Sequence, residues 1–168
     1  MILADTDILS AMAKVTRLPL IFSLLRTTEL NITPGVFGEL KHSFDRGRPY
    51  AQDVFALIQT SQIRRINLTP SEIAFRDTLP ATLGAGERES IAVSKERGGI
   101  ILSNESRVVH YCRQYGIPCL RLPDLLRALW VEGIVSKQEV IDIISDLQVK
   151  DRMQFKQSVL DTIFDDET

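Results

Sequence analysis

The sequence contains few of the residues that bind soft metals or form disulfides. Its 168 residues include two cysteines, Cys112 and Cys119, which form neither a Cys-x-x-Cys pair nor a disulfide framework. The two histidines, His42 and His110, have no partner at the spacing of zinc ligands. The composition therefore argues against a disulfide-rich secreted domain and against a zinc site.

Long apolar runs are missing as well. The longest candidate, residues 18–25, is interrupted by Pro19 and Ser23, and it falls far short of the roughly 18 apolar residues that a membrane span needs. The first residues are unlike a secretory signal, because Asp5 and Asp7 lie where a basic end and an apolar stretch are required. We therefore expect a cytoplasmic protein with no membrane partner.

The charge is nearly balanced but unevenly distributed. A net charge of −2, with 25% charged and 44% hydrophobic residues, is typical of one globular domain and argues against binding nucleic acid by bulk charge alone. Residues 1–130 contain 16 Lys and Arg against 13 Asp and Glu, whereas residues 131–168 contain 4 against 9. The chain ends in Asp165-Asp166-Glu167, which indicates either an acidic tail or the solvated face of a helix.

Short apolar runs alternate with helical patterns along the first 122 residues. Two of these runs, residues 1–4 and 100–102, are apolar throughout, as expected for parallel strands covered on both faces. The five predicted strands are residues 1–4, 30–32, 63–68, 100–102 and 118–122. The alternation predicts an α/β fold in three layers (α/β/α), with a parallel central sheet of about five strands.

Capping signals mark where the helices begin and end. Thr33 precedes a proline, and Thr69 and Ser136 each precede a glutamate by three residues, which is the pattern of a capping box. Gly98 and Gly116 are expected to end the helices before the fourth and fifth strands. After residue 122 the pattern is wholly helical, so we predict one domain at residues 1–122 and a helical extension at residues 123–168 that packs on it.

Acidic residues follow the predicted strands at the edge where α/β proteins bind ligands. Asp5 directly follows the first strand, with Asp7 two residues later, and Glu105 lies just beyond the fourth strand. Glu39 and Glu87 lie in the helices that follow residue 33 and Gly84-Ala85-Gly86. As structural alternatives, Asp5 or Asp7 could cap the next helix, and Glu87 and Glu105 could complement helix N-termini. Such roles stabilise by roughly 0.3–2 kcal/mol.

Carboxylates that converge on one edge need compensation. A pair at about 4 Å repels by roughly 4 kcal/mol at an effective dielectric constant near 20, so some carboxyl groups would stay protonated without a cation. Mg²⁺ or Mn²⁺ removes this conflict, because these ions prefer oxygen ligands and commonly take only one or two protein carboxylates. The acids therefore predict a divalent metal site.

The acids lie in four segments whose order and spacing form a pattern. The segments are ILADTDIL at residues 2–9, TPGVFGEL at 33–40, LGAGERESIA at 83–92 and ILSNE at 101–105. This pattern resembles the PIN-domain family of metal-dependent ribonucleases, in the toxin-like subgroup with Gly-x-Gly-Glu before its third acid. The tail from residue 123 is similar to the helical extension of that subgroup, which makes residues 1–122 the catalytic domain.

The resemblance implies hydrolysis of RNA by metal-activated water. It places four residues, Asp5, Glu39, Glu87 and Glu105, in catalytic roles, and implies Asp5, Glu87 and Glu105 as ligands of Mg²⁺ or Mn²⁺. The fourth segment departs from the family, because Asn104-Glu105 stands where an aspartate is expected. Either Glu105 supplies the acid, or Asn104 takes the position as a neutral ligand. Asp7, an extra carboxylate, could then replace the lost charge, and Glu39 could bind a second ion or orient the nucleophile.

Several polar residues near these acids could contact substrate. The expected contacts to metal-bound water or phosphate are Ser103 and Asn104, and the expected phosphate contacts are Lys41, His42, Arg46, Arg48 and Arg88. The pair Arg64-Arg65 flanks a strand and could serve only the fold. Solvated surface is the structural alternative for all of these cations.

Three functions compete at this point. The first is a metal-dependent endoribonuclease that acts on RNA, with an antitoxin protein as partner if it is the toxin of a toxin–antitoxin pair. The second is a catalytically weak or inactive nucleic-acid-binding module of the same fold. The third, a nucleotide-binding α/β enzyme, is disfavoured because Arg88 and Glu89 follow Gly84-Ala85-Gly86 where a dinucleotide motif needs another glycine. The apolar stripes of the extension allow either packing within the chain or a homodimer.

Overall fold

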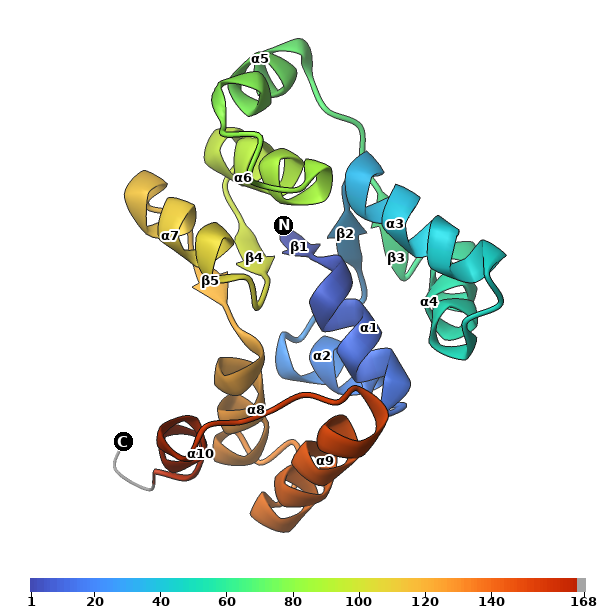
Figure 1. Ribbon diagram of the computed structural model, residues 1–168, viewed down its shortest axis with the longest axis vertical. Coiled ribbons are helices and arrows are strands. Elements are labelled where there is room, and N and C mark those ends of the chain that lie inside the picture. The colour runs from blue at the N-terminus through green and yellow to red at the C-terminus, as the bar shows by residue number, and fades with distance from the viewer. Residues whose placement is uncertain (166–168) are drawn as a thin grey trace.

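A computed structural model of the chain describes residues 1–165 and contains a five-stranded parallel sheet (Figure 1). The strands lie in the order β3-β2-β1-β4-β5, and every neighbouring pair is parallel. Their bounds are β1 Ile2–Ala4, β2 Leu30–Ile32, β3 Ile63–Arg65, β4 Ile100–Leu102 and β5 Cys119–Leu120. The α/β class and the parallel sheet predicted from the sequence are confirmed.

Helices surround the sheet and extend beyond it. They are α1 Thr6–Lys14, α2 Leu18–Leu24, α3 Pro34–Asp45, α4 Pro49–Gln59, α5 Pro70–Thr78, α6 Ala85–Arg97, α7 Ser106–Tyr115, α8 Leu122–Val131, α9 Lys137–Lys150 and α10 Gln157–Phe164. In Figure 1 the last three gather at one end of the molecule, whereas α5 and α6 lie at the opposite end. Within residues 1–165 no helix is long and apolar enough to cross a membrane.

Alternate strand residues enter two different cores. Leu3 and Ile101 pack with residues of α6 and α7, whereas Ala4 and Leu102 pack with residues of α1, α2, α8 and α9. Successive side chains of a strand point to opposite faces, so both faces of the sheet are covered by helices. This explains why the first and fourth strands are apolar at every position.

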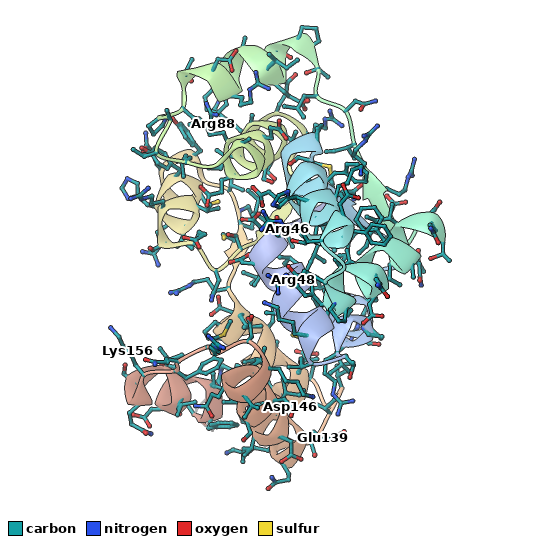
Figure 2. The ribbon with its side chains drawn as sticks, turned by 45° about the vertical axis from the view of Figure 1, so that its right-hand side comes forward. Arg46, Arg48, Arg88, Glu139, Asp146 and Lys156 are labelled. Carbon is teal, nitrogen blue, oxygen red and sulfur yellow. The ribbon has the colours of Figure 1, made fainter. Side chains whose placement is uncertain are left out.

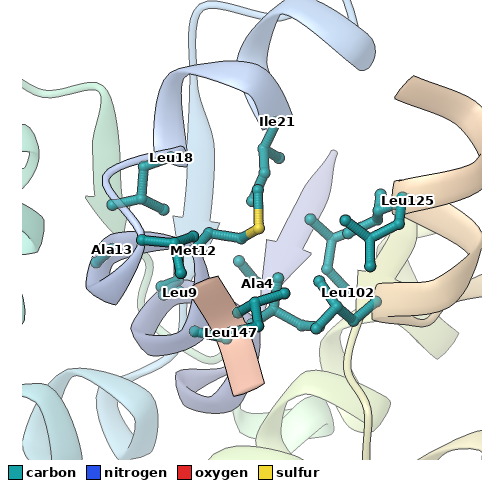
Figure 3. Close-up of a cluster of buried hydrophobic side chains, with 14 of the residues drawn as sticks. Ala4, Leu9, Met12, Ala13, Leu18, Ile21, Leu102, Leu125 and Leu147 are labelled. Carbon is teal, nitrogen blue, oxygen red and sulfur yellow. The ribbon is translucent and has the colours of Figure 1, made fainter. Parts of the chain in front are cut away.

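The C-terminal helices share the larger core with the N-terminal part of the chain. Figure 3 shows side chains of α8 and α9, including Leu125 and Leu147, around Ala4, Leu9 and Met12. The apolar stripe of α10 is also covered within the chain, because Ile163 is fully buried in this core. Two residues of the predicted acidic tail, Asp166 and Glu167, lie outside the described residues.

The capping signals act as predicted. Thr33, Thr69 and Ser136 precede α3, α5 and α9, and each hydroxyl accepts a hydrogen bond from a backbone N–H of the first turn. Gly98 and Gly116 follow α6 and α7 with φ of 73° and 67°, backbone angles that glycine adopts without steric cost.

Besides β1, which begins at Ile2 and not at residue 1, two strands are shorter than the sequence suggests. Residues 63–68 were expected to form one strand, but β3 ends at Arg65, after which Arg97 binds the Asn67 carbonyl and α5 begins. Residues 118–122 were also expected to be extended, but α8 begins at Leu122, because the Asp124 carboxylate accepts a hydrogen bond from the Arg121 N–H and caps that helix. In both places a polar contact formed on folding overrides the apolar run.

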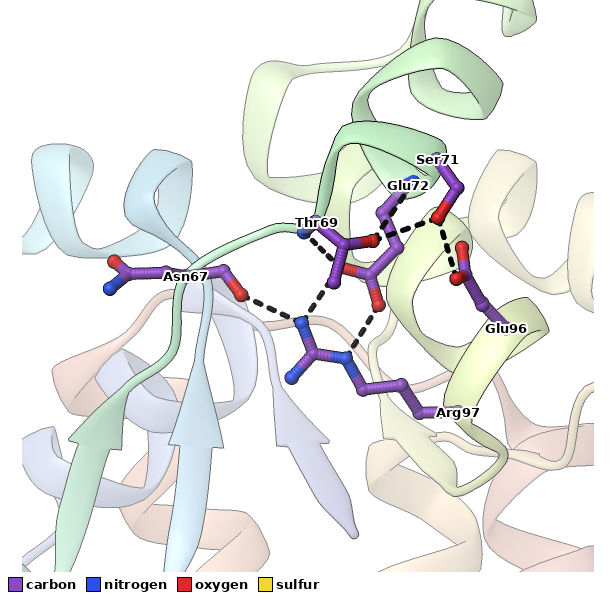
Figure 4. A network of polar contacts seen from close by, with 6 residues as sticks. All are labelled: Asn67, Thr69, Ser71, Glu72, Glu96 and Arg97. Carbon is purple, nitrogen blue, oxygen red and sulfur yellow. Dashed lines mark hydrogen bonds and ion pairs between the residues drawn. The ribbon is translucent and has the colours of Figure 1, made fainter.

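An ion pair between a buried carboxylate and a partly exposed arginine joins the start of α5 to the end of α6 (Figure 4). The Arg97 guanidinium donates from Nε to Glu72 Oε1 at 2.5 Å and from its terminal nitrogen to Glu72 Oε2 at 2.7 Å. The Glu72 side chain is fully buried, and these hydrogen bonds hold its pKa below the ordinary value. The contribution to stability is therefore present at neutral pH and is lost as the pH falls through the folded-state pKa.

Replacing Arg97 with methionine should lower the free energy of unfolding by about 2 kcal/mol, because a buried carboxylate would lose its partner. The loss stays below that of a fully buried pair because Arg97 itself is one-third exposed. Urea denaturation at pH 7 measures the change. Arg113→Met, at an exposed position of α7, is the matched control and should leave the midpoint unchanged.

Candidate functional site

Asp5 lies where the sheet reverses its strand order. The chain fills one side of β1 with β2 and β3 and then crosses to the other side with β4 and β5. Ligands of open α/β sheets bind in the crevice at such a point, outside the carboxyl ends of the strands. Asp5 follows β1 directly, and its neighbours across the crevice are the residues that follow β4.

Hydrogen bonds fix both oxygens of Asp5. Oδ1 accepts from the Thr6 N–H at 2.8 Å, which caps α1, and Oδ2 accepts from the Ser103 hydroxyl at 3.0 Å. Ser103 is fully buried, and its hydroxyl positions Asp5. The sequence placed Ser103 among the contacts to metal-bound water or phosphate, and that role stays a prediction.

Asp7 binds the loop after β4. Its Oδ2 accepts from the Asn104 N–H at 2.8 Å, and its Oδ1 accepts from the Ile8 N–H at 2.7 Å. The carboxylates of Asp5 and Asp7 therefore both face the Ser103–Asn104 segment, from the first turn of one helix. The charge of Asp7 acts on Asp5, and a role of Asp7 as a compensating charge stays a prediction.

Burial and neighbouring negative charges raise the pKa of both aspartates. Burial has the largest effect on Asp5 and raises its pKa to about 7, with a further contribution from the charge of Asp7 and a smaller one from Glu39. Burial also raises the pKa of Asp7 to about 6, and the charges of Glu105 and Glu87 add to it. All five acids therefore contribute to one negative field at this edge of the sheet.

The three glutamates are held differently around this edge. Glu39 is exposed on α3 and accepts a hydrogen bond from the Thr6 hydroxyl, which links it to the residue beside Asp5. Glu87 is half-buried and its carboxylate accepts from the Gly84 N–H at 2.8 Å, so the capping alternative applies to it. Glu105 is exposed and precedes α7.

Two glycines bring α3 and α6 together and so set where Glu39 and Glu87 lie. A Cβ on Gly35 would lie 2.5 Å from the Gly86 nitrogen, and a Cβ on Gly86 would lie 2.7 Å from a methyl carbon of Val36. Neither position has room for a side chain. Gly86, the second glycine of the Gly-x-Gly-Glu segment, therefore allows the first turns of α3 and α6 to pack closely.

Glu89 is a buried acid that the sequence did not single out. Its carboxylate accepts from the Gly35 N–H at 2.6 Å and lies 3.8 Å from an Arg76 guanidinium nitrogen. Glu89 therefore holds the first turn of α3 against α6, beside the glycine contact. The only signal in the sequence was a second glutamate two residues after Glu87, on a helix with few apolar residues.

The donor set at this edge consists of oxygen atoms. Within residues 1–165 no three His, Cys, Asp or Glu side chains come close enough together to hold one metal ion between them. Asp5 and Asp7 both bind the same loop, and the side-chain oxygen of Asn104 is buried there with no hydrogen-bond partner among the described residues. Two repelling carboxyls and an unsatisfied carbonyl oxygen fit a hard divalent cation, which commonly takes one or two carboxylates.

A comparison with protein families adds a finding to this geometry. A family model described as a PIN domain matches residues 1–166, which is nearly the whole chain. The chain belongs to the PIN-domain family. PIN domains are generally nucleases and typically use divalent metal ions, so a nucleic acid is the expected class of substrate. The comparison with curated proteins gives no match.

The predicted phosphate contacts of this PIN domain, and the pair Arg64-Arg65 that the sequence left open between fold and substrate, differ in whether they have a partner within the chain. Lys41 is paired with Asp45 one turn later at 2.7 Å, Arg64 with Glu29 at 3.0 Å, and the Arg65 guanidinium lies 4.9 Å from the centre of the Phe37 ring. These three have partners within the chain. Arg46, Arg48 and Arg88, which are labelled in Figure 2, have no ion pair within residues 1–165, and Nε of Arg88 is buried without a partner.

Proposed function

We propose that this PIN domain is a metal-dependent endoribonuclease. The observation that supports the proposal best is the pair Asp5 and Asp7, two carboxyls with raised pKa at the point where the strand order reverses. Buried carboxylates that repel one another destabilise the fold unless a bound cation neutralises their charge. Carboxyl groups with a shifted pKa in a crevice are also typical of functional sites.

Asp5, Asp7 and the Asn104 side-chain oxygen would hold the cation, Mg²⁺ or Mn²⁺, with Glu87 and Glu105 beside them. When bound there, the ion supplies activation of a water molecule and neutralisation of phosphate charge. Asp7 thereby supplies the charge that Asn104 lacks. In this respect the proposal differs from the set Asp5, Glu87 and Glu105 that the resemblance implies.

Other residues would orient these ligands or accept the proton of the attacking water. The Ser103 hydroxyl and the Thr6 N–H fix the orientation of Asp5, which reduces the reorganisation needed during the reaction. Glu39, exposed and oriented by the Thr6 hydroxyl, is the candidate to accept a proton from the attacking water. Because Glu39 lies on α3, its distance from Asp5 depends on the packing of α3 against α6.

A cleavage assay tests the proposal. The protein is incubated with single-stranded RNA in Mg²⁺, in Mn²⁺ and in excess chelator, and the products are separated by length. Internal cleavage should require the metal and return when metal is restored. Cleavage that persists at full rate in chelator would contradict the proposal, whereas tight RNA binding without any cleavage would favour the alternative of an inactive binding module.

The finer role as a toxin is also a proposal, and it rests on the resemblance of the Gly-x-Gly-Glu segment and helical extension. Induced expression in bacteria should then arrest growth, and the Asp5→Asn variant at equal abundance should not. A partner antitoxin would relieve the arrest. The toxin role would be contradicted if cells grew normally while they contained enough wild-type protein to cleave RNA measurably in their extracts.

A further inference from the structure

A basic cavity lies apart from the acidic edge, where the last turns of three helices meet. It has a volume of about 450 Å³. Its charged lining includes Lys14 at the end of α1, Arg46 and Arg48 after α3, Lys150 at the end of α9, and Asp151 and Arg152 after α9. The lining therefore combines residues that are more than 100 positions apart in the sequence. Only one of these six charged side chains is acidic.

Part of this positive charge is already compensated within the chain. Lys14 forms an ion pair with Asp151, and Lys150 lies 3.2 Å from Asp146 one turn earlier on α9. Within residues 1–165, Arg46, Arg48 and Arg152 form no ion pair. In this described part of the chain, three guanidinium groups around the cavity therefore have no carboxylate as an ion-pair partner.

Helix termini explain only part of this arrangement. Cations are favoured near a helix C-terminus, which accounts for a single basic residue at each of the three helix ends. It does not account for three uncompensated arginines around one cavity, because like charges there repel one another. Arg152 also has a left-handed backbone, with φ of 53°, a conformation that costs a non-glycine residue free energy.

The cavity is aligned with the acidic edge along two helices. On α1, Lys14 lies seven residues after Asp7. In the same way Arg46, the residue that follows α3, lies seven residues after Glu39. Seven residues are close to two full turns, so each pair projects from the same side of its helix, about 10 Å apart along the axis. Both helices therefore carry an acid near the proposed cleavage site and a cation at the cavity.

We propose that this cavity binds a backbone phosphate of the nucleic-acid strand whose scissile phosphate lies at Asp5 and Asp7. The inference rests on the proposed function, since it takes the same strand as ligand. Arginine suits the role because its planar group donates two hydrogen bonds to one phosphate. The C-terminal extension, through Arg152, becomes part of the substrate-binding surface and not only of the core.

Binding to a labelled single-stranded RNA oligonucleotide tests the inference, with the Asp5→Asn protein in chelator so that no cleavage occurs. Arg46→Gln combined with Arg152→Gln should weaken binding by about tenfold or more at low salt. The slope of log affinity against log salt concentration should fall by about 0.7 for each phosphate group that the variant no longer binds. Lys156→Gln is the matched control, because Lys156 is exposed and lies outside the cavity (Figure 2).

The outcomes separate this inference from the proposed function. Unchanged affinity and salt slope in the double variant, compared with the control, would overturn the phosphate site even if the wild type cleaves RNA. The same would follow if the double variant failed to bind inorganic phosphate but retained RNA affinity. Conversely, weaker RNA binding by the double variant supports the site even if the wild type proves unable to cleave.

Discussion

Replacing Asp5 with asparagine should reduce metal-dependent RNA cleavage by about 10³-fold. The substitution keeps the size of the side chain and an oxygen that can still cap α1 through the Thr6 N–H. It removes the carboxylate charge that we assign to the cation, which contributes several kcal/mol of transition-state stabilisation in metal-dependent hydrolysis. Rates on an oligoribonucleotide at saturating Mg²⁺ measure the loss.

A matched acid on the surface provides the control for this experiment. Asp45 is exposed at the end of α3, where it pairs with Lys41. Asp45→Asn should therefore keep the wild-type rate. If Asp5→Asn retained more than about a tenth of the activity, Asp5 would not be a ligand of the ion, and the assignment of the site would be wrong.

The same Asp5 substitution should alter how stability depends on pH in the metal-free protein. Burial, and then the charge of Asp7, raise the pKa of Asp5 from 3.8 to about 7. Between about pH 4 and pH 7 the folded protein thus keeps a proton that the unfolded chain releases, so stability falls as pH rises. Because one pKa unit corresponds to about 1.4 kcal/mol, Asp5 accounts for at most roughly 4 kcal/mol of this loss.

Thermal unfolding in chelator at pH 5 and pH 8 measures this dependence. The melting temperature of the wild type should be lower at pH 8, and Asp5→Asn should reduce the difference. Saturating Mg²⁺ should then stabilise the wild type at pH 8 but not the variant, because a ligand stabilises only the state that binds it. Equal pH slopes for the two proteins would contradict the burial of an ionisable group at this position.

Sequence patterns were sufficient where a feature depends on neighbouring residues. The runs of residues 1–4 and 100–102 predicted strands covered on both faces, and Thr33, Thr69 and Ser136 predicted three helix starts. Asp5 and Asp7 became candidate site residues because an acid just after a buried strand lies at the ligand-binding edge, and their role stays a prediction. These signals are local, so one chain segment carries each of them.

Features that need two distant segments could not be predicted. The Ser103 hydroxyl binds Asp5, 98 residues earlier, and the role of Glu89 depends on the Gly35 N–H, 54 residues earlier. The basic cavity similarly combines α1 and α3 with Arg152, which no sequence spacing brings together. The net charge of −2 likewise does not show how charges are distributed in the fold, where an acidic edge and a basic cavity both occur.

The second large effect is expected from Gly35→Ala, which tests how the glycine contact positions the glutamates. The added Cβ would lie 2.5 Å from the Gly86 nitrogen and 2.8 Å from its Cα. Because these are backbone atoms of α6, no side-chain rotation can relieve the overlap, and the two helices must separate. We expect the free energy of unfolding to fall by about 3 kcal/mol, measured by urea denaturation.

Cleavage should fall together with stability in Gly35→Ala, because the separation moves Glu39 and Glu87 relative to Asp5. A displacement of about 1 Å can lower a rate by roughly 10²-fold. We therefore expect the cleavage rate per folded molecule of Gly35→Ala to be lower than that of the wild type by about this factor. Rates are therefore measured at a temperature well below the melting point of the variant. Loss of stability with an unchanged rate would show that neither glutamate needs this placement.

Gly38→Ala is the matched control, three residues further along α3. A Cβ at Gly38 would meet no atom within 4 Å, and the position is exposed, so alanine should stabilise the helix by about 0.5–1 kcal/mol. The same chemical change in one helix is thus expected to have opposite effects at the two glycines. The difference follows from α6, which touches Gly35 and not Gly38. A lower cleavage rate in Gly35→Ala but not in Gly38→Ala would show that the position of Glu39 depends on the glycine in the segment that carries Glu87.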